Sequence, residues 1–142
     1  MYLIDTNVIS ELRKKSNANI GVLNFFKQAT EENLKFYLSA ITIGELRRGV
    51  EKIRHRNDLE QSSVLEKWLE QIISDYSNWI INFSELEAQV WGALRVPNHE
   101  NSIDKQIAAT ALVNNLTLVT RNTSDFEKTG VKLLNPFEAS AQ

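Results

Sequence analysis

Five short runs rich in β-branched and aromatic residues alternate along this chain with longer segments of helical periodicity. Short runs of this kind are typical of buried strands, whereas apolar residues three and four positions apart are typical of helices that pack on a sheet. The alternation predicts an α/β fold: a central parallel sheet of about five strands, flanked by helices and joined by right-handed crossovers. The strand-like runs are residues 2–4, 35–40, 79–83, 116–120 and 131–134.

Length and composition predict one globular domain over residues 1–142. Hydrophobic residues make up 42% of the chain and charged residues 24%, as in typical globular domains. The formal net charge is −2, so contact with a nucleic acid would require a local basic patch. The chain contains no cysteine, which excludes disulfides, thiol nucleophiles and cysteine-ligated zinc.

The same features predict a cytoplasmic protein. The absence of cysteine suits a reducing compartment. No apolar run approaches the roughly 18 residues needed to span a bilayer, so we expect no membrane segment. The amino terminus has no basic region ahead of an apolar stretch, as a secretory signal peptide would have.

Acidic and amide side chains follow three of the predicted strands. Asp5 ends the first strand, Glu45 lies in the first turns of the helix after the second, and Asn122 and Asp125 follow the fourth. In a parallel sheet these three places lie along the same edge, where α/β proteins bind their ligands. Asp104 opens the helix that leads into the fourth strand, and it faces this edge if the 96–102 loop folds back.

Each of these residues also has a structural explanation. Asp5 can cap the following helix, and Thr42 with Glu45 matches a capping box. Asp104 suits the positive end of its helix, and Asp125 suits a turn. Carboxylates brought together, however, repel and raise one another's pKa unless a cation neutralises them. Carboxylate oxygens suit a hard ion, so we predict a site for Mg²⁺ or Mn²⁺.

Other α/β site patterns are absent. A phosphoacceptor receiver domain has paired acids after its first strand, and a haloacid-dehalogenase-type site has Asp-x-Asp where this chain has Asp5, Thr6 and Asn7. Neither common glycine-rich phosphate loop occurs. His55 and His99 lie in charged or polar surroundings, and we expect both to be exposed to solvent.

A basic run follows Glu45 on the predicted 42–55 helix. It includes Arg47, Arg48 and Lys52. Such a run is usually a solvated helix face. Because it begins beside a predicted metal-site acid, it is also a candidate surface for the phosphates of RNA.

Four segments carry a resemblance to a known family. They are LIDTNVIS (3–10), SAITIGELRRG (39–49), DKQIAATA (104–111) and LVTRNTSDF (118–126), followed by Gly130-Val131 and Asn135-Pro-Phe137. Together, and in this order, they resemble a PIN domain that covers the whole chain. The match is closest to the VapC and FitB toxins of bacterial toxin–antitoxin pairs.

The resemblance implies a Mg²⁺-dependent endoribonuclease that could also use Mn²⁺. It places metal-site acids at Asp5, Glu45 and Asp104. The family's variable fourth acid corresponds to Asn122, with Asp125 three residues on. Thr6 and Asn7 either orient Asp5 and the attacking water or cap the helix.

The resemblance also implies partners. These are an RNA substrate and a cognate antitoxin of the VapB or FitA kind, which the basic run could also dock, with operator DNA bound only through the antitoxin. A homodimer is expected as well. The alternative is a FitB-like chain with weak or no catalysis, which forms an autoregulatory complex with a DNA-binding antitoxin.

Overall fold

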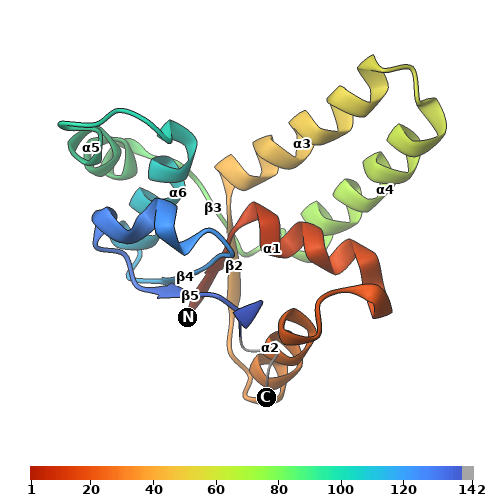
Figure 1. Cartoon of the computed structure of the whole chain (residues 1–142), viewed down its shortest axis with the longest axis horizontal. Helices are drawn as coiled ribbons and strands as arrows, with labels where there is room; N and C mark the ends of the chain where they lie inside the picture. Colours follow the sequence, from red (N-terminus) through yellow and green to blue (C-terminus); the bar gives the residue numbers. More distant parts are fainter. Residues whose placement is uncertain (139–142) are drawn as a thin grey trace.

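Five parallel strands form the centre of the fold, in the order β3–β2–β1–β4–β5 (Figure 1). This computed structural model describes residues 1–138, so residues 139–142 of the predicted 1–142 domain lie outside the described part. The predicted α/β class and the parallel sheet of five strands are confirmed. The strands are β1 (Tyr2–Ile4), β2 (Phe36–Ser39), β3 (Ile80–Ile81), β4 (Thr117–Val119) and β5 (Leu133–Leu134).

The first strand lies at the middle of the sheet and pairs with β2 on one side and β4 on the other. In this register Ile4 is the partner of Val119, so the residues that follow them, Asp5 and Thr120, leave the sheet side by side. Successive strand residues point to opposite faces. Leu3 accordingly packs in one core cluster and Ile4 in the other, and all of these apolar side chains are buried.

Four helices cover the face of the sheet towards which the Ile4 side chain points. Leu46 and Val50 of α3 and Leu65 and Leu69 of α4 pack there with the first two helices. A 3-10 segment, η1 (Leu12–Asn17), extends the first helix. The helices are α1 (Thr6–Glu11), α2 (Ile20–Glu31), α3 (Ala40–His55) and α4 (Leu59–Asp75), with α3 and α4 forming a projecting hairpin (Figure 1).

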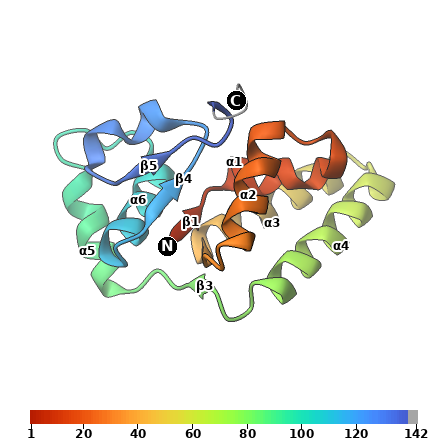
Figure 2. The ribbon, with the colours of Figure 1, turned by 90° about the horizontal axis from the view of Figure 1, so that it is seen from below.

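The opposite face of the sheet is covered by α5 (Glu85–Leu94), α6 (Ser102–Val113) and the 3-10 segment η2 (Thr123–Thr129), which lie across the molecule from the hairpin (Figure 2). Buried alanines of α6, among them Ala108 and Ala111, form its packing face. Ser84 and Glu87 form a capping box at the start of α5.

The start of α3 differs from the sequence prediction. Strand β2 ends at Ser39 and the helix begins at Ala40, with the Ser39 side chain accepting a 3.0 Å hydrogen bond from the Ile41 amide. The predicted capping box at Thr42 and Glu45 is therefore wrong. Thr42 lies inside the first turns of the helix, and its buried hydroxyl has no hydrogen-bond partner among the described residues.

An ion-pair network joins α3 to α4 along the hairpin. Arg47 donates hydrogen bonds of 2.8 and 2.7 Å to the two carboxylate oxygens of Glu66, and Arg54 donates one of 3.0 Å. Arg47 and Arg54 also contact Glu51. Hydrogen bonds from Arg47, and then from Arg54, lower the pKa of Glu66 to about 2. The two helices are thus tied by polar contacts on one side and by apolar packing on the other.

Candidate functional site

Asp5 lies at the point where β1 becomes α1. It caps the helix, since Oδ1 accepts a 2.7 Å hydrogen bond from the Thr6 amide. Its other oxygen, Oδ2, accepts a 2.8 Å hydrogen bond from the Thr120 hydroxyl and a longer one, 3.4 Å, from Asn7. The residue is only 4% exposed. A carboxylate held in place at both oxygens has one orientation, which suits a ligand as well as a cap.

Thr120 and Asn7 connect the ends of the two central strands. Asn7 donates a 3.3 Å hydrogen bond to the Thr120 hydroxyl and accepts one of 3.0 Å from the Arg121 amide. The same hydroxyl accepts a hydrogen bond from the Asn122 amide. Thr120 was not among the residues predicted from the sequence. The sequence places it directly after the fourth strand, as Asp5 follows the first, but only the register of the two strands shows that these residues meet.

Asp104 lies in the first turn of α6, as predicted, and is half-buried. The pKa of this carboxyl is raised to about 6, first by partial burial and then by the negative charges of Asp5, Asp125 and Glu45, in that order. The effect of those charges shows that Asp5, Asp125 and Glu45 all lie within electrostatic reach of Asp104. The 96–101 loop therefore does bring Asp104 to the edge where Asp5 lies.

Burial also raises the pKa of Asp5, and the nearby charge of Glu45 acts in the same direction. The hydrogen bonds from Thr120 and from the Thr6 amide oppose this rise. Glu45 lies on α3 and, among the described residues, makes no hydrogen bond or ion pair. Since it neither caps its helix nor pairs with a cation, the structure gives it no local stabilising role.

The turn after β4 places Asn122 and Asp125 differently. Asn122 precedes η2, and its backbone amide binds Thr120, but its side chain makes no capping hydrogen bond. Asp125 lies in the first turn of η2, next to Phe126, which is fully buried and anchors that segment to the sheet. Of the two residues, Asp125 is the one whose charge reaches Asp104.

The donor set fits a hard divalent cation in its chemistry, because the site offers carboxylate oxygens and no sulfur or imidazole. The buried hydroxyl of Thr6, beside Asp5, has no hydrogen-bond partner among the described residues. As the side chains stand, however, no three acidic or histidine side chains within residues 1–138 are grouped closely enough to hold a metal ion. His55 and His99 are exposed, as predicted.

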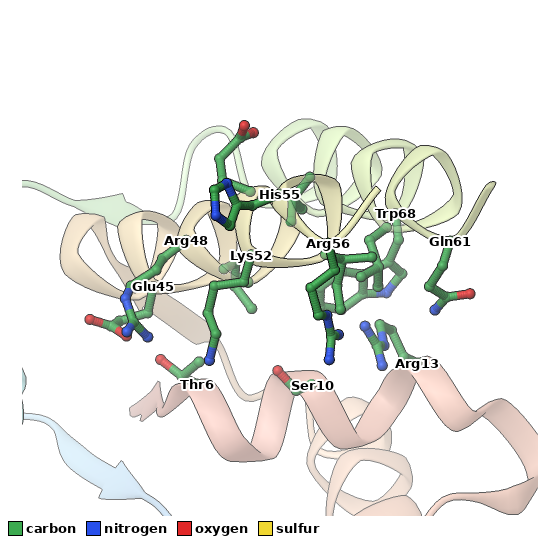
Figure 3. A pocket seen from close by; sticks show the side chains of 16 residues that line it. Thr6, Ser10, Arg13, Glu45, Arg48, Lys52, His55, Arg56, Gln61 and Trp68 are labelled. Carbon is green, nitrogen blue, oxygen red and sulfur yellow. The ribbon is translucent and has the colours of Figure 1, made fainter. Parts of the chain in front are cut away.

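A cleft of about 720 Å³ extends from Glu45 between α1, α3 and α4. Glu45 and Thr6 lie at one end, and Trp68 and Arg13 lie towards the other (Figure 3). The α3 side chains Arg48, Lys52 and Arg56 extend from the helix towards α1 (Figure 3). The cleft therefore has an acidic residue at one end and basic side chains along the rest of its length.

The predicted RNA-contact residues divide between two faces of α3. Arg48 and Lys52 line the cleft as that prediction requires. Arg47 lies on the other face, where both of its terminal nitrogens bind Glu66, and this placement removes it from the candidate RNA surface. Arg13, on η1, lines the cleft and lies 5.6 Å from the centre of the Trp68 ring. It was missed because it lies far from the basic run in the sequence.

Comparison with known proteins finds the same fold and the same family throughout. Residues 2–132 match the model of the PIN domain. Toxin FitB of Neisseria gonorrhoeae is 37% identical over 96% of this chain and 99% of its own length. The solved FitAcB structure from that organism has a TM-score of 0.83 and 35% identity, covering 96% and 99% of the two chains.

Two further relatives bear on function. VapC ribonuclease Y4jK of Sinorhizobium fredii is 34% identical over 97% of this chain and 99% of its own length. VapBC2 from Rickettsia felis, solved bound to a DNA fragment from its promoter, has a TM-score of 0.69 and 26% identity over 94% of this chain and 97% of that one.

Proposed function

We propose that this chain, which belongs to the PIN-domain family, is a metal-dependent endoribonuclease and the toxin of a toxin–antitoxin pair. The observation that carries the proposal is the placement of four acids together: Asp5 after β1, Glu45 on α3 and Asp125 on η2 lie near enough to Asp104 on α6 for their charges to raise its pKa. Crowding acids at one edge is unfavourable in the free chain. Such an arrangement is typical of sites that bind a cation.

Asp5 and Asp104 would hold a Mg²⁺ or Mn²⁺ ion directly. Glu45 and Asp125 would complete its surroundings, directly or through water. When bound, the ion supplies acidity for an attacking water and neutralises charge on the attacked phosphate. In the metal-free chain the carboxylates repel one another. A bound cation would neutralise their charge and allow them to move closer together.

The neighbouring polar residues would position the Asp5 carboxylate and the groups that bind beside it. Thr120 and Asn7 fix the orientation of Asp5 through its Oδ2 oxygen. The buried hydroxyl of Thr6 has no hydrogen-bond partner within residues 1–138, and a ligand bound beside that carboxylate would give it one. Cleavage by in-line attack of water would leave a 5′-phosphate and a 3′-hydroxyl.

The cleft supplies charge for the substrate backbone. Arg48 and Lys52 extend from α3 beside Glu45, so a phosphate held there lies close to the acids (Figure 3). Arg13 and Arg56 continue the positive charge along the same cleft. These contacts to the backbone would hold RNA whatever its sequence. We also propose that the reaction takes place in the cytoplasm.

The second candidate function is that of a binding partner with weak or no catalysis. It is favoured by the 37% identity to toxin FitB and by the absence, within residues 1–138, of three acids grouped closely enough to hold a metal ion. In this case the chain would join a VapB- or FitA-like antitoxin in a complex that binds operator DNA through the antitoxin. The relative VapBC2 of Rickettsia felis was likewise solved bound to a fragment of its promoter DNA.

Cleavage of total cellular RNA in Mg²⁺ or Mn²⁺, together with growth after expression of the chain alone, separates the two functions. The nuclease proposal expects cleavage that EDTA abolishes and growth arrest that Asp5→Ala and Asp104→Ala both relieve. Asp75→Ala, at the exposed end of α4, is the matched control and should behave as wild type. A folded wild type that cleaves no RNA and is tolerated as well as Asp5→Ala would leave the binding partner.

A further inference from the structure

A second cleft opens beside Asp125. It lies between the loop before α6 and η2, which run side by side (Figures 1 and 2), and has a volume of about 350 Å³. That size falls in the range of small-ligand sites, roughly 300–1,000 Å³. Its lining includes Val96, Pro97 and Asn98 from the loop and Ser124 and Asp125 from η2.

Asp125 connects this cleft to the candidate metal site. It lines the cleft, and its charge raises the pKa of Asp104. Glu45 and Thr6, from the other part of the site, line the cleft between α1 and α3. Acids of the candidate site thus line both clefts, Glu45 the first and Asp125 the second, so a strand that crosses the site would pass from one cleft to the other.

The two clefts differ in charge. The first is lined by Arg13, Arg48, Lys52 and Arg56 against two glutamates. The second has two lysines, Lys105 and Lys128, against three acids, Glu100, Asp125 and Glu127. A backbone of phosphates is suited to the first cleft and unsuited to the second. What enters the second should be the uncharged part of a nucleotide.

The walls of the second cleft suit a nucleobase. Val96 is 77% exposed and with Pro97 gives an apolar surface on which a flat ring can lie. Asn98 and Ser124 add an amide and a hydroxyl, and within residues 1–138 neither side chain makes a hydrogen bond. The loop itself is held, because the ammonium group of Lys105 donates to the Asn98 carbonyl. Amide donors and acceptors of this kind read the edges of unpaired bases.

We propose that this second cleft binds the nucleobase next to the cleaved phosphate and so sets the base preference of the enzyme. The proposal rests on the proposed ribonuclease function. It requires that the base be turned out of any stack, so the substrate is single-stranded at that position. Asn98 and Ser124 are the residues that discriminate between bases, and the first cleft contributes affinity without preference.

The test is a titration of the full ¹⁵N-labelled chain with each of the four nucleoside 5′-monophosphates, in EDTA so that neither metal nor cleavage contributes. We expect amide shifts at Asn98, Ser124 and Lys128, with affinities that differ at least threefold between bases. Asn98→Ala and Ser124→Ala should each weaken the binding of the preferred nucleotide by about three- to tenfold. Asn24→Ala, an exposed asparagine on α2, is the matched control and should change nothing.

Ribose 5-phosphate tests the wild type without any variant, since it carries the phosphate and lacks the base. Equal shifts with ribose 5-phosphate, no shifts, or shifts confined to the first cleft would each overturn the nucleobase site. RNA cleavage by the same preparation separates the two proposals. A chain that cleaves RNA without these shifts contradicts the nucleobase site alone, whereas one that shows base-dependent shifts but cleaves nothing contradicts the nuclease and retains the site.

Discussion

The hydroxyl of Thr120 donates a 2.8 Å hydrogen bond to Oδ2 of Asp5, joining the ends of the two neighbouring strands at the centre of the sheet. Both residues are buried, so the bond is protected from water. A hydrogen bond to a buried charged group contributes more than one at the surface. This contact therefore determines both how the strand ends are joined and how the carboxylate is oriented.

Thr120→Val keeps the shape of the side chain and removes that bond. We expect a loss of about 1–3 kcal/mol in the free energy of unfolding at pH 7, because a buried carboxylate loses a donor. Thr120→Ser retains the hydroxyl and should lose less than half as much. Urea titration of the three proteins measures this, and equal stability of wild type and Thr120→Val would show that the bond contributes nothing.

Asp104→Asn should become more stable, relative to wild type, as the pH rises. The pKa of Asp104 is raised from 3.8 to about 6 in the folded chain, so the folded chain holds this proton more tightly than the unfolded chain. The stability that the proton contributes is full below about pH 4 and is lost as the pH rises through about 6. Allowing for solvent screening of a half-exposed group, we expect a difference of about 1 kcal/mol between pH 4 and pH 7.5.

Thermal unfolding of the metal-free proteins across that range gives the measurement. Asp75→Asn removes one exposed carboxylate from the end of α4 and controls for the change in net charge. Added Mn²⁺ should reverse the order of stability at pH 7.5, since it would bind the wild type and stabilise it by mass action. A stability loss of about 2 kcal/mol or more in metal-free Asp104→Asn would instead indicate a structural hydrogen-bonding role.

Replacing the basic residues of α3 should have two different effects. Arg48→Ala with Lys52→Ala removes two cleft cations, and the slope of log affinity for single-stranded RNA against log salt should fall by about 1.4. Arg47→Ala should leave that slope unchanged and lower the thermal midpoint, because its guanidinium holds Glu66 on α4. Fluorescence anisotropy over a salt series, paired with thermal scans, decides the matter. A reduced salt slope in Arg47→Ala would return Arg47 to the RNA surface.

Which residue caps α3 can be tested with two substitutions, one at Ser39 and one at Thr42. Ser39→Ala removes the observed cap and should destabilise the chain by about 1 kcal/mol. Thr42→Val removes a buried hydroxyl that has no partner among the described residues, so it should be neutral or slightly stabilising. Chemical denaturation of both variants ranks them. If Thr42→Val were instead the more destabilising substitution, the capping box expected at Thr42 from the sequence would be supported.

The sequence predicted the edge on which the acids lie because that edge depends only on strand order and helix connections. Asp5 and Glu45 each come next after a strand or within two turns of it, and parallel strands end together. Thr120 was missed because a threonine at the end of a strand is ordinary in composition. Its significance comes from register, which pairs Ile4 with Val119 and cannot be read from either segment alone.

The errors on α3 have different physical causes. Ser39 and Thr42 are both good caps, and the choice between them depended on where β2 ended and on the absence of any connecting loop between β2 and α3. The basic run was treated as one surface, but successive residues on a helix are about 100° apart. Arg47 and Arg48 therefore face different neighbours, and the partner of Arg47, Glu66, comes from another helix.

The central place of β1 also has a consequence for the order of synthesis. Asp5 is synthesised well before Thr120, which holds its carboxylate and follows 115 positions later. At translation rates of about 5–20 residues per second, this interval is on the order of ten seconds. For most of this interval, the growing chain carries Asp5 before Asp104, Asp125 and β4 have been made. A ribosome that terminates before β4 releases a product with no assembled site, so a harmful activity of the chain would be withheld until β4 has been made.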